Sequence, residues 1–542
     1  MSRLRLPDLQ SAHLLDRRTV LQIALAAQAA LAFGGPARAA GTDRLKFGEP
    51  EPFSYDGLKA FAKNLAGKPY QPPAAPDPAI VQKIDYDAHG KIKFKPEDAL
   101  YAESAGAYPI TFMHVGRFFP KTVRMHAVAD GQSREILYDP SLFDMPADSI
   151  ARGLPAQPSA FAGFWVREAK DQVTDKGDWK AREPFATFLG ASYFRAIGGA
   201  GQVGMSARGV ALFPPPGAAE EFPDFISFWF EPARTNGDPV TVFALLDGPS
   251  LSGAYRFLIH RTAGTLMEIE AEVTMRKEVA RLGLAPLTSM YWFSETAKPN
   301  LIDWRPEVHD SDGLAMWTGA GERIWRPLNN PPRIMTSTFS DENPKGFGLL
   351  QRDRDFDHYE DGVRYEDRPS TWVEPVGDWG KGAVQLVELP TDDEIHDNVV
   401  AYWIPEQSAA PGATIALAYK LHWQDDEPFP TGLGRCVATR LGRGGQPGLP
   451  RPAGVRKFIV EFLGGPLADI PYGETVEPVL WASRGKFSYV FAEAVPSDIK
   501  GHWRAQFDLT VEGAEPVEMR CYLKAGGQVL TETWLYQYHP AP

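Results

Sequence analysis

The stretch "VTVFALLDGPSLSGAYRFLIHRTAGTLMEIEAEVTMR", residues 240–276, holds three runs of strand-forming residues separated by turn residues. The runs VTVFALLD, YRFLIH and MEIEAEVTMR alternate, or nearly alternate, between apolar and polar side chains. A period of two is typical of a strand with one buried face, whereas a helix needs a period near 3.6. The stretch therefore predicts antiparallel β-structure.

The same pattern recurs along the whole chain. Seven further runs show it: TVRMHAV, ISFWFEP, AVQLVELP, VVAYWIP, TIALAYKLHW, KFIVEFLG and VEMRCYLKA. The 50 glycines and 48 prolines are scattered, which argues against long helices. Only "YDGLKAFAKNLAGKPY" has helical spacing, with Leu58, Phe61, Ala62 and Leu65 on one face and a stop at Gly67. We predict a mainly β fold.

The length of the chain predicts two domains after an N-terminal leader. Small residues, Pro and Gly interrupt the strand pattern in "PEQSAAPGAT", and we place a linker there, at residues 406–414. The preceding residues 40–405 need a large β-sandwich. The following residues 415–542 have the size and the short strands of an immunoglobulin-like β-sandwich.

The first 39 residues have the pattern of a signal peptide. Arg17 and Arg18 precede an apolar run over residues 20–33, and the small-x-small triplet at 37–39 offers a cleavage site near Ala39. The run is shorter than the roughly 18–20 apolar residues that span a bilayer. The paired arginines predict export to the periplasm by the twin-arginine route, and the alternatives are a general secretory signal or a membrane anchor.

The charge of the chain limits its partners. Residues 1–39 hold five basic and two acidic residues, so the remainder carries 51 Lys+Arg against 67 Asp+Glu, a net charge of −16. Such a protein is a poor candidate for binding nucleic acid, and a neutral ligand such as a sugar fits better. The two cysteines, Cys436 and Cys521, could form at most one disulfide, which the sequence leaves open.

Several motifs of cofactor and metal chemistry are missing from the sequence. It has no GxxxxGK[ST], HExxH or CxxC, and "GGAGQVG" at 198–204 lacks the βαβ setting of a dinucleotide site. "MSARG" does not supply the G-x-S-x-G of a serine hydrolase. His309 and His396 lack paired metal-ligand spacing. We predict no cofactor and no metal.

Aromatic, amide and charged residues are concentrated between residues 300 and 403. Sugar sites need flat aromatic faces for pyranose rings, with planar amides, carboxylates and arginines for the hydroxyl groups. The alternative is chance clustering in a β-protein with 12% aromatic residues. From this region we select the following substrate-binding candidates: Trp317, Arg326, Asn329, Lys345, Tyr359, Arg368, Trp372 and Lys381.

The acids of "PTDDEIHDNVVAYW", residues 390–403, fall into two groups. Asp392, Asp393 and Glu394 have the pattern of a solvated turn. Asp397 stands directly before a strand that should be buried, so we expect it to be partly desolvated. Desolvation favours the protonated carboxyl that a general acid needs.

A second group of acids lies in "WRPEVHDSDGLAMW", where Asp310 and Asp312 stand two residues apart. In an extended chain they would share one face, so either could be a catalytic base. The alternative is that both only accept hydrogen bonds from turn amides. Cleavage of a glycosidic bond needs one acid to protonate the leaving oxygen and a second carboxylate to activate water.

Long blocks of the sequence resemble one known family. The blocks are FAKNLAGKPY, FLGASYFRA, SARGVAL, EEFPDF, SGAYRF, HDSDGLAMW, RPLNNP, NPKGFGLLQRDRDFDHYED, WGKG and ETWLYQYHP. They are similar to the periplasmic glucan biosynthesis proteins of the OpgG/OpgD (MdoG/MdoD) family, over essentially the whole chain after the leader. The paired-arginine leader resembles the D branch of that family.

The resemblance implies a galactose-mutarotase-like N-terminal β-sandwich joined to an immunoglobulin-like one. It also implies a role in setting the backbone structure of osmoregulated periplasmic glucans, which are β-1,2-linked glucose chains. Members resemble inverting endo-β-1,2-glucanases, which implies Asp397 as general acid and Asp310 as a general base acting through relayed waters. Tyr365 and Glu394 match positions that line that site.

Two other functions remain open at this level. The protein could be a non-catalytic glucan-binding protein that assists a membrane glucan synthase or a branching enzyme. It could instead be a mutarotase-like epimerase of free sugars. The sequence also leaves the oligomeric state open.

Overall fold

The computed structural model describes residues 44–104, 106, 108–170, 178–213, 220–235, 237–298, 302–407, 409–471 and 473–540. The predicted signal peptide, residues 1–39, lies outside these residues. Within them, no helix is both long enough and apolar enough to cross a bilayer.

All ten predicted runs contain strands, and the mainly β fold is confirmed. β14 (Val240–Asp247), β15 (Leu251–Arg261) and β16 (Thr265–Met275) form the predicted antiparallel stretch. Tyr255 and Ile269 lie on its buried face, whereas Arg256 and Glu270 pair on the other. The alternation in the sequence therefore records which face of this sheet is buried.

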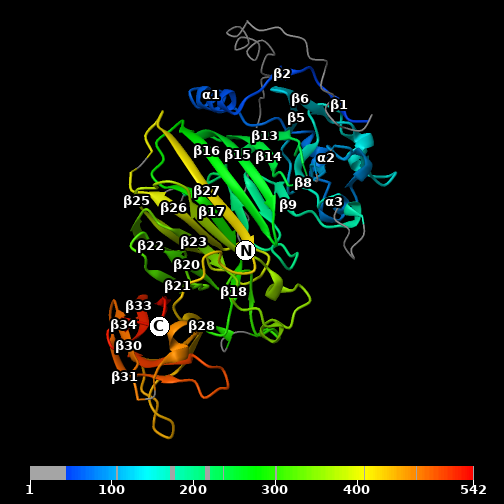
Figure 1. Ribbon diagram of the computed structural model, residues 1–542. Helices are drawn as coiled ribbons and strands as arrows, with labels where there is room; N and C mark the ends of the chain where they lie inside the picture. Colours follow the sequence, from blue (N-terminus) through cyan, green and yellow to red (C-terminus); the bar gives the residue numbers. More distant parts are fainter. Residues whose placement is uncertain are drawn as a thin grey trace. The chain divides into compact units, whose positions relative to one another are not determined.

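β14, β15 and β16 belong to the first of two large sheets (Figure 1). Its strands run in the order β6, β5, β13, β14, β15, β16, β27, β24, β23, β20 and β21. The bounds not yet given are β6 Gln132–Leu137, β5 Arg124–Ala129, β13 Asp224–Glu231, β27 Thr414–Gln424, β24 Ser370–Pro375, β23 Gly346–Leu350, β20 Gly313–Trp317 and β21 Arg323–Pro327.

The second sheet has ten strands, in the order β22, β25, β26, β17, β11, β10, β9, β8 and β4, with β12 also paired to β17. Their bounds are β22 Met335–Glu342, β25 Lys381–Glu388, β26 Val399–Pro405, β17 Leu282–Ser289, β11 Ser206–Arg208, β12 Val210–Leu212, β10 Tyr193–Ala196, β9 Ala186–Leu189, β8 Phe161–Val166 and β4 Ile110–His114. Apolar side chains from both sheets meet in one core, which gives a large β-sandwich.

The predicted helix is present as α1, Tyr55–Ala66, which ends at Gly67 and is capped by Ser54. Leu58 and Ala62 pack on Phe243 of β14, so the helix covers the outer face of the first sheet. Phe61, which the spacing places on the same face, is 42% exposed.

A second, smaller β-sandwich follows, with its own apolar core. One layer has the order β28, β29, β32, β31, and the other contains β30, β33, β34 and β35. The bounds are β28 Arg435–Arg443, β29 Val455–Leu463, β32 His502–Thr510, β31 Lys486–Ala494, β30 Glu477–Ala482, β33 Val517–Ala525, β34 Gln528–Val529 and β35 Thr533–Tyr538. Cys436 and Cys521 are both buried free thiols in this core.

The predicted linker at 406–414 needs correction. β27 pairs with β16 and β24, so it is a strand of the first large sheet. The Pro- and Gly-rich segment before it joins the two sheets of one sandwich, β26 to β27. The smaller sandwich begins only after Gln424, and β35 pairs in parallel with β21 of the large one.

Short strands and α-helices also occur in the described part of the chain. They are β1 Lys46–Phe47, β2 Glu51–Pro52, α2 Pro78–Val81, α3 Tyr86–Gly90, β3 Lys93–Phe94, β7 Phe143–Asp144, β18 Tyr291–Phe293 and β19 Val308–His309. "GGAGQVG" is a turn with Gly201 at positive φ, as predicted.

Candidate functional site

Asp310 and Asp397 lie on either side of one short chain segment, Met290–Tyr291, where β17 has ended and β18 begins. The Asp310 N–H donates to the Met290 carbonyl at 2.8 Å. On the other side, the Asn398 side chain accepts from the Tyr291 N–H at 2.8 Å and donates to the Tyr291 carbonyl at 2.9 Å. The fold thereby brings together two acids that are far apart in the sequence.

The loop that carries Asp397 is fixed at both ends by asparagines. Asn398 also donates to the Leu389 carbonyl at 2.9 Å, which closes the loop onto itself. Asn330 donates to the Thr391 carbonyl at 2.7 Å and accepts from its N–H at 3.0 Å. Because these amides replace backbone partners, the loop is held although it has no strand of its own.

We expect Asn398→Asp to destabilise the protein. Asn398 is buried, and a carboxylate would place a negative charge against the two carbonyls that its amide now satisfies. The expected loss is about 1–3 kcal/mol of unfolding free energy or more, measured by urea denaturation. Asp397→Asn, one residue earlier but exposed, is the control and should leave the midpoint unchanged.

Asp310 is a buried carboxylate beside a cation. It is 5% exposed and forms an ion pair with Arg368, which also lies over the Tyr365 ring at 4.6 Å. Burial raises the pKa of Asp310 to about 6; the nearby charge of Asp397 adds to the rise, and Arg368 opposes it. The two aspartates therefore act on one another electrostatically.

The expectation that Asp397 is partly desolvated was wrong. Its side chain is exposed, although Asn398 and Val399 after it are buried. The burial of β26 begins one residue later than the pattern suggests, because Asn398 turns inward to hold Tyr291. The predicted solvated turn is confirmed for Asp392 and Asp393, which are exposed.

Glu394 joins Asp397's loop to a third segment. Its carboxylate accepts from the Tyr365 hydroxyl at 3.0 Å and pairs with Arg305. Arg305 also pairs with Asp361 at 2.8 Å and with Asp303 at 3.1 Å. With Arg368 on Tyr365, these contacts make one connected network from Asp310 to Glu394.

His309, directly before Asp310, is buried and doubly bonded. Its ring donates to Glu307 at 2.9 Å and to the Gln351 side-chain oxygen at 3.1 Å. Burial alone would lower the pKa of His309, but the bond to Glu307 and the charge of Asp312 raise it to about 9. A cationic His309 therefore stands beside Asp310 at neutral pH.

Gln351 and Asp312 support the site from behind. The fully buried Gln351 amide donates to the Tyr359 hydroxyl at 2.8 Å and to the Tyr365 carbonyl at 3.0 Å. Asp312 accepts from the backbone N–H of Asp353 at 2.7 Å and thus orders the loop after β23. Asp312 behaves as the turn-ordering alternative predicted, whereas Asp310 does not.

Two predicted substrate-binding residues, Arg326 and Asn329, instead contact the buried carboxylate of Glu388. The Arg326 and Glu388 side chains are 1% and 0% exposed and lie 2.9 Å apart. Asn329 donates its backbone N–H to Glu388 at 2.6 Å and its side chain to the Gln537 carbonyl at 2.9 Å. The Arg326–Glu388 pair joins β21 to β25 within the large sandwich, and the Asn329 side chain links this region to β35 of the smaller one.

Tyr359 and Trp372 are also buried, at 0% and 1% exposure. Tyr359 lies behind Tyr365, with ring centroids 5.9 Å apart, so it supports the site rather than faces it. Trp372 belongs to the core of the smaller sandwich. Composition alone could not separate these buried rings from exposed ones.

Trp317 and Lys345 lie at the far end of β20 from Asp310. The Trp317 ring is covered by Arg323 at 3.9 Å and approached by Lys345 at 5.1 Å. It also packs near Phe429. The length of β20 therefore separates this pair from the two aspartates.

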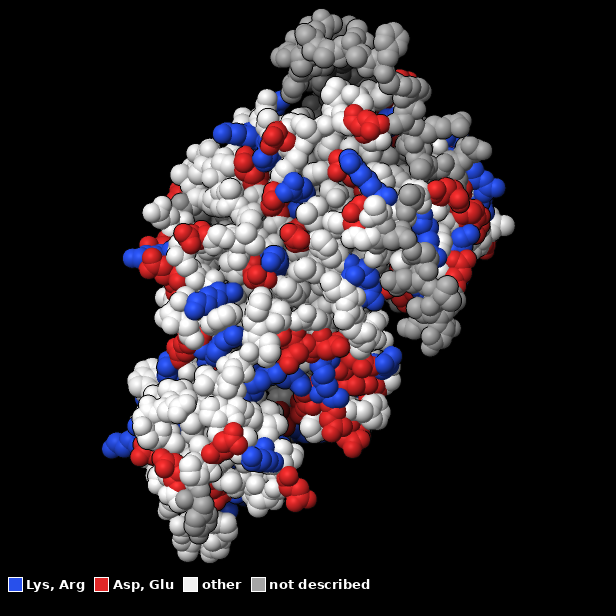
Figure 2. Space-filling view, viewed as in Figure 1, with Lys and Arg blue, Asp and Glu red and all other residues white. Residues whose placement is uncertain are grey.

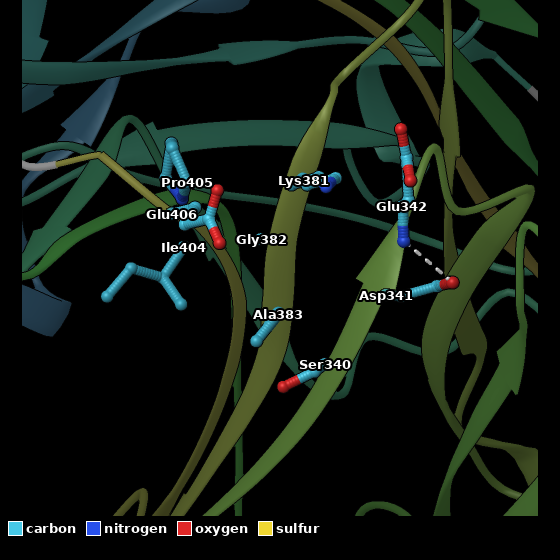
Figure 3. A pocket seen from close by; sticks show the side chains of 9 residues that line it. All are labelled: Ser340, Asp341, Glu342, Lys381, Gly382, Ala383, Ile404, Pro405 and Glu406. Carbon is cyan, nitrogen blue, oxygen red and sulfur yellow. Dashed lines mark hydrogen bonds between the residues drawn. The ribbon is translucent and has the colours of Figure 1, made fainter.

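Lys381 lines a separate cavity of about 440 Å³, together with residues of β22, β25 and β26 (Figure 3). Lys381 begins β25, whereas Glu388 at its end pairs with Val399, the first residue after the Asp397 loop. The cavity is thus at the opposite end of these strands from Asp397. Of the predicted residues, only Tyr365, Arg368 and Glu394 gather with Asp310 and Asp397.

Among the described residues, Glu307, Asp353 and His358 could place ligand atoms within 4.8 Å of one another, as a metal site requires. Their existing partners are histidines: His309 donates to Glu307, and His358 donates to Asp353. The carboxylates of this cluster are therefore already paired with histidines.

Sequence reasoning missed Arg305 and Gln351, which organise the site. Arg305 stands in the quoted block WRPEVHDSD but has no local pattern that marks it. Gln351 is buried directly after β23, with no local pattern that marks its role. Their partners are distant in sequence, so only the fold reveals them.

Acidic and basic side chains are interspersed over the face seen in Figure 2, and their densest gathering there contains both signs. That face has no single-sign patch of the kind that attracts a polyanion. The surface charge therefore agrees with the choice of an uncharged ligand.

Comparison with known proteins identifies the family. Residues 53–538 match the family model described as "Periplasmic glucan biosynthesis protein, MdoG". The chain is 59% identical over 529 residues to Glucans biosynthesis protein D 2 of Ralstonia nicotianae, covering 97% of this chain and 98% of that relative. It is 44% identical to Glucans biosynthesis protein D of Xanthomonas axonopodis pv. citri, covering 97% and 99%. The chain therefore belongs to the MdoG family of periplasmic glucan biosynthesis proteins.

Proposed function

We propose that this protein acts on the glucose backbone of osmoregulated periplasmic glucans as an inverting endo-β-1,2-glucanase. The observation that carries the proposal is the placement of a buried carboxylate, Asp310, and an exposed one, Asp397, on either side of Met290–Tyr291. Glycoside hydrolysis needs two such groups in different environments.

The placement of the two acids leaves room for an inverting reaction, because a chain segment keeps their backbones apart. They flank one chain segment, so their backbones are about two inter-strand spacings apart, roughly 10 Å. Inverting enzymes hold their carboxyl groups about 6.5–9.5 Å apart to leave room for water, and retaining enzymes about 5–5.5 Å. A base that acts through relayed waters tolerates the longer distance.

In this mechanism Asp310 is the base and Asp397 the acid. Asp310, with a pKa of about 6, is ionised at neutral pH and can draw a proton from water. Asp397 is exposed in the free protein, and a bound glucan would displace its water. Asp397 then donates its proton to the leaving oxygen.

The test is incubation of the mature protein with linear β-1,2-glucan. We expect shorter oligosaccharides whose first-formed reducing ends are α-anomers, detected by polarimetry or NMR. An initial β-anomer would mean retention and would overturn the assigned roles. Binding without cleavage would favour a glucan-binding assistant of a membrane synthase or branching enzyme, and anomerisation of free glucose without cleavage a mutarotase-like epimerase.

Export by the twin-arginine route is part of the proposal, with cleavage near Ala39. Replacing Arg17 and Arg18 with lysine keeps the charge of the leader but removes the guanidinium pair. We expect the precursor to remain in the cytoplasm, measured by fractionation and immunoblotting. Undiminished periplasmic protein would show that the leader is a general secretory signal.

A further inference from the structure

Two buried arginines near the aspartate pair each contact two aromatic rings through the guanidinium group. The Arg208 guanidinium lies 4.9 Å from the Tyr193 ring centroid and 5.4 Å from that of Phe222. The Arg305 guanidinium lies 5.8 Å and 5.7 Å from the rings of Trp292 and Trp304. The same arrangement thus occurs twice, on elements that are far apart in the sequence.

The arginines are rigid supports. The Arg208 side chain is 3% exposed and donates to Thr288 at 2.8 Å and Glu220 at 2.6 Å. The Arg305 side chain is 9% exposed and is held by Asp303, Asp361 and Glu394. A guanidinium fixed in this way orients an aromatic ring by stacking on its face.

The outer ring of each group remains open to solvent. Phe222 is 43% exposed and Trp304 is 66% exposed. Single exposed apolar residues need no explanation, but here each exposed ring is stacked on a fixed cation that belongs to, or borders, the site network. Such a ring is pre-positioned to receive a flat apolar surface from solution.

The two groups flank the aspartate pair along one chain segment. Thr288 contacts Arg208, Met290 contacts Asp310, and Trp292 contacts Arg305. These are alternate residues over a span of roughly 13 Å. The Asp397 loop, on the other side of this segment, lies near both arginine groups. Glu394 of the loop pairs with Arg305. Burial raises the pKa of Tyr193, which lies on Arg208, and the nearby charge of Asp397 adds to that rise.

We propose that Phe222 and Trp304 are pyranose-stacking platforms, one on each side of the glycosidic bond that is cut. The inference rests on the proposed function and deepens it. A glucan whose glucose rings bind on both sides of Asp310 and Asp397 is bound at internal units of the glucan rather than at its end. The two platforms therefore make internal cleavage the expected mode and set the lengths of the products.

The test compares Phe222→Ala and Trp304→Ala with a matched control, Trp481→Ala. Trp481 is 56% exposed and lies on β30 of the smaller sandwich. We expect each platform variant to bind linear β-1,2-glucan about tenfold more weakly by isothermal titration calorimetry. KM should rise by a similar factor and kcat at saturation should change less than about twofold, as loss of uniform binding predicts.

Two further variants separate stacking from structure. Phe222→Tyr and Trp304→Phe keep a ring and should retain most of the affinity. Because both rings are exposed, the alanine variants should unfold at the wild-type temperature. Each platform variant should also change the lengths of the released oligosaccharides, because the glucan loses its stacking contact on one side of the cleaved bond.

The outcomes distinguish this inference from the proposed function. Wild-type affinity in both alanine variants, with cleavage intact, would overturn the platforms and leave the glucanase standing. Equal weakening in Trp481→Ala would also overturn them, because binding would then not be local to the site. A wild-type protein that neither binds nor cleaves β-1,2-glucan would remove both proposals together.

Discussion

Asp397→Asn should abolish glucan cleavage while the protein continues to bind glucan. A general acid supplies the proton to the leaving oxygen, and its removal commonly costs about 10²–10⁴-fold in kcat. The amide has nearly the shape of the carboxyl, and Asp397 is exposed, so its replacement disturbs no packing. The measurements are kcat with linear β-1,2-glucan and the affinity for that glucan by calorimetry.

The matched control for this change is Asp393→Asn. Asp393 is an exposed carboxylate in the same loop, so its replacement removes one negative charge at nearly the same place. We expect near wild-type turnover from it. Near wild-type turnover in Asp397→Asn would remove Asp397 from the mechanism, and an equal loss in both variants would point to the charge of the loop rather than to an acid.

The strands could be predicted because their signal is local. In MEIEAEVTMR, each residue records whether it faces the core, and β16 follows that alternation. The predicted linker was wrong because the position of a domain boundary depends on distant strand pairing and not on a local signal. A Pro- and Gly-rich segment marks a turn, but it cannot say whether the next strand, β27, returns to the same sandwich or starts another.

The site was only partly predictable, because residue type does not report burial or partners. Arg326 is a residue type that often binds sugar hydroxyl groups, yet it is fully buried against Glu388, which lies on a distant strand. Asp397 was expected to be desolvated, yet Asn398 takes the buried place. Arg305 has no sequence pattern at all, and its role follows from Asp361 and Glu394, which the fold brings to it beside the neighbouring Asp303.

The aspartates differ in environment in a way that the mechanism can use. Burial raises the pKa of Asp310, and the charges of Arg368 and His309 oppose that rise, so the fold sets its ionisation. Asp397 faces solvent, so its surroundings change when a ligand covers it. A site that must first hold water and then exclude it needs this asymmetry.

Asp310→Asn is expected to lower kcat by about 10²–10⁴-fold and to remove the acidic limb of the pH profile. In the wild type the base must be ionised, so kcat/KM should fall about tenfold per pH unit below the Asp310 pKa of about 6. An asparagine cannot titrate, and the residual activity should therefore be flat through this range. The profile is measured from pH 4.5 to 8 on both proteins.

The same change should not destabilise the fold at neutral pH. Because burial raises the pKa of Asp310 above its ordinary value of 3.8, the native state binds more protons than the unfolded state between about pH 4 and 6. The contribution of Asp310 to the unfolding free energy therefore falls as pH rises through that window, and above it the buried charge is a cost. Asparagine removes this cost, and its amide oxygen can still accept a hydrogen bond from Arg368.

Stability and turnover together separate a catalytic base from a loop-ordering residue. If Asp310 only orders its loop, Asp310→Asn should lower the unfolding temperature and leave turnover per folded molecule unchanged. Asp312→Asn is the control for that behaviour, since Asp312 accepts backbone hydrogen bonds from the loop after β23. Loss of the alkaline limb instead of the acidic one in Asp310→Asn would mean that the two aspartates exchange roles, with Asp310 as the acid.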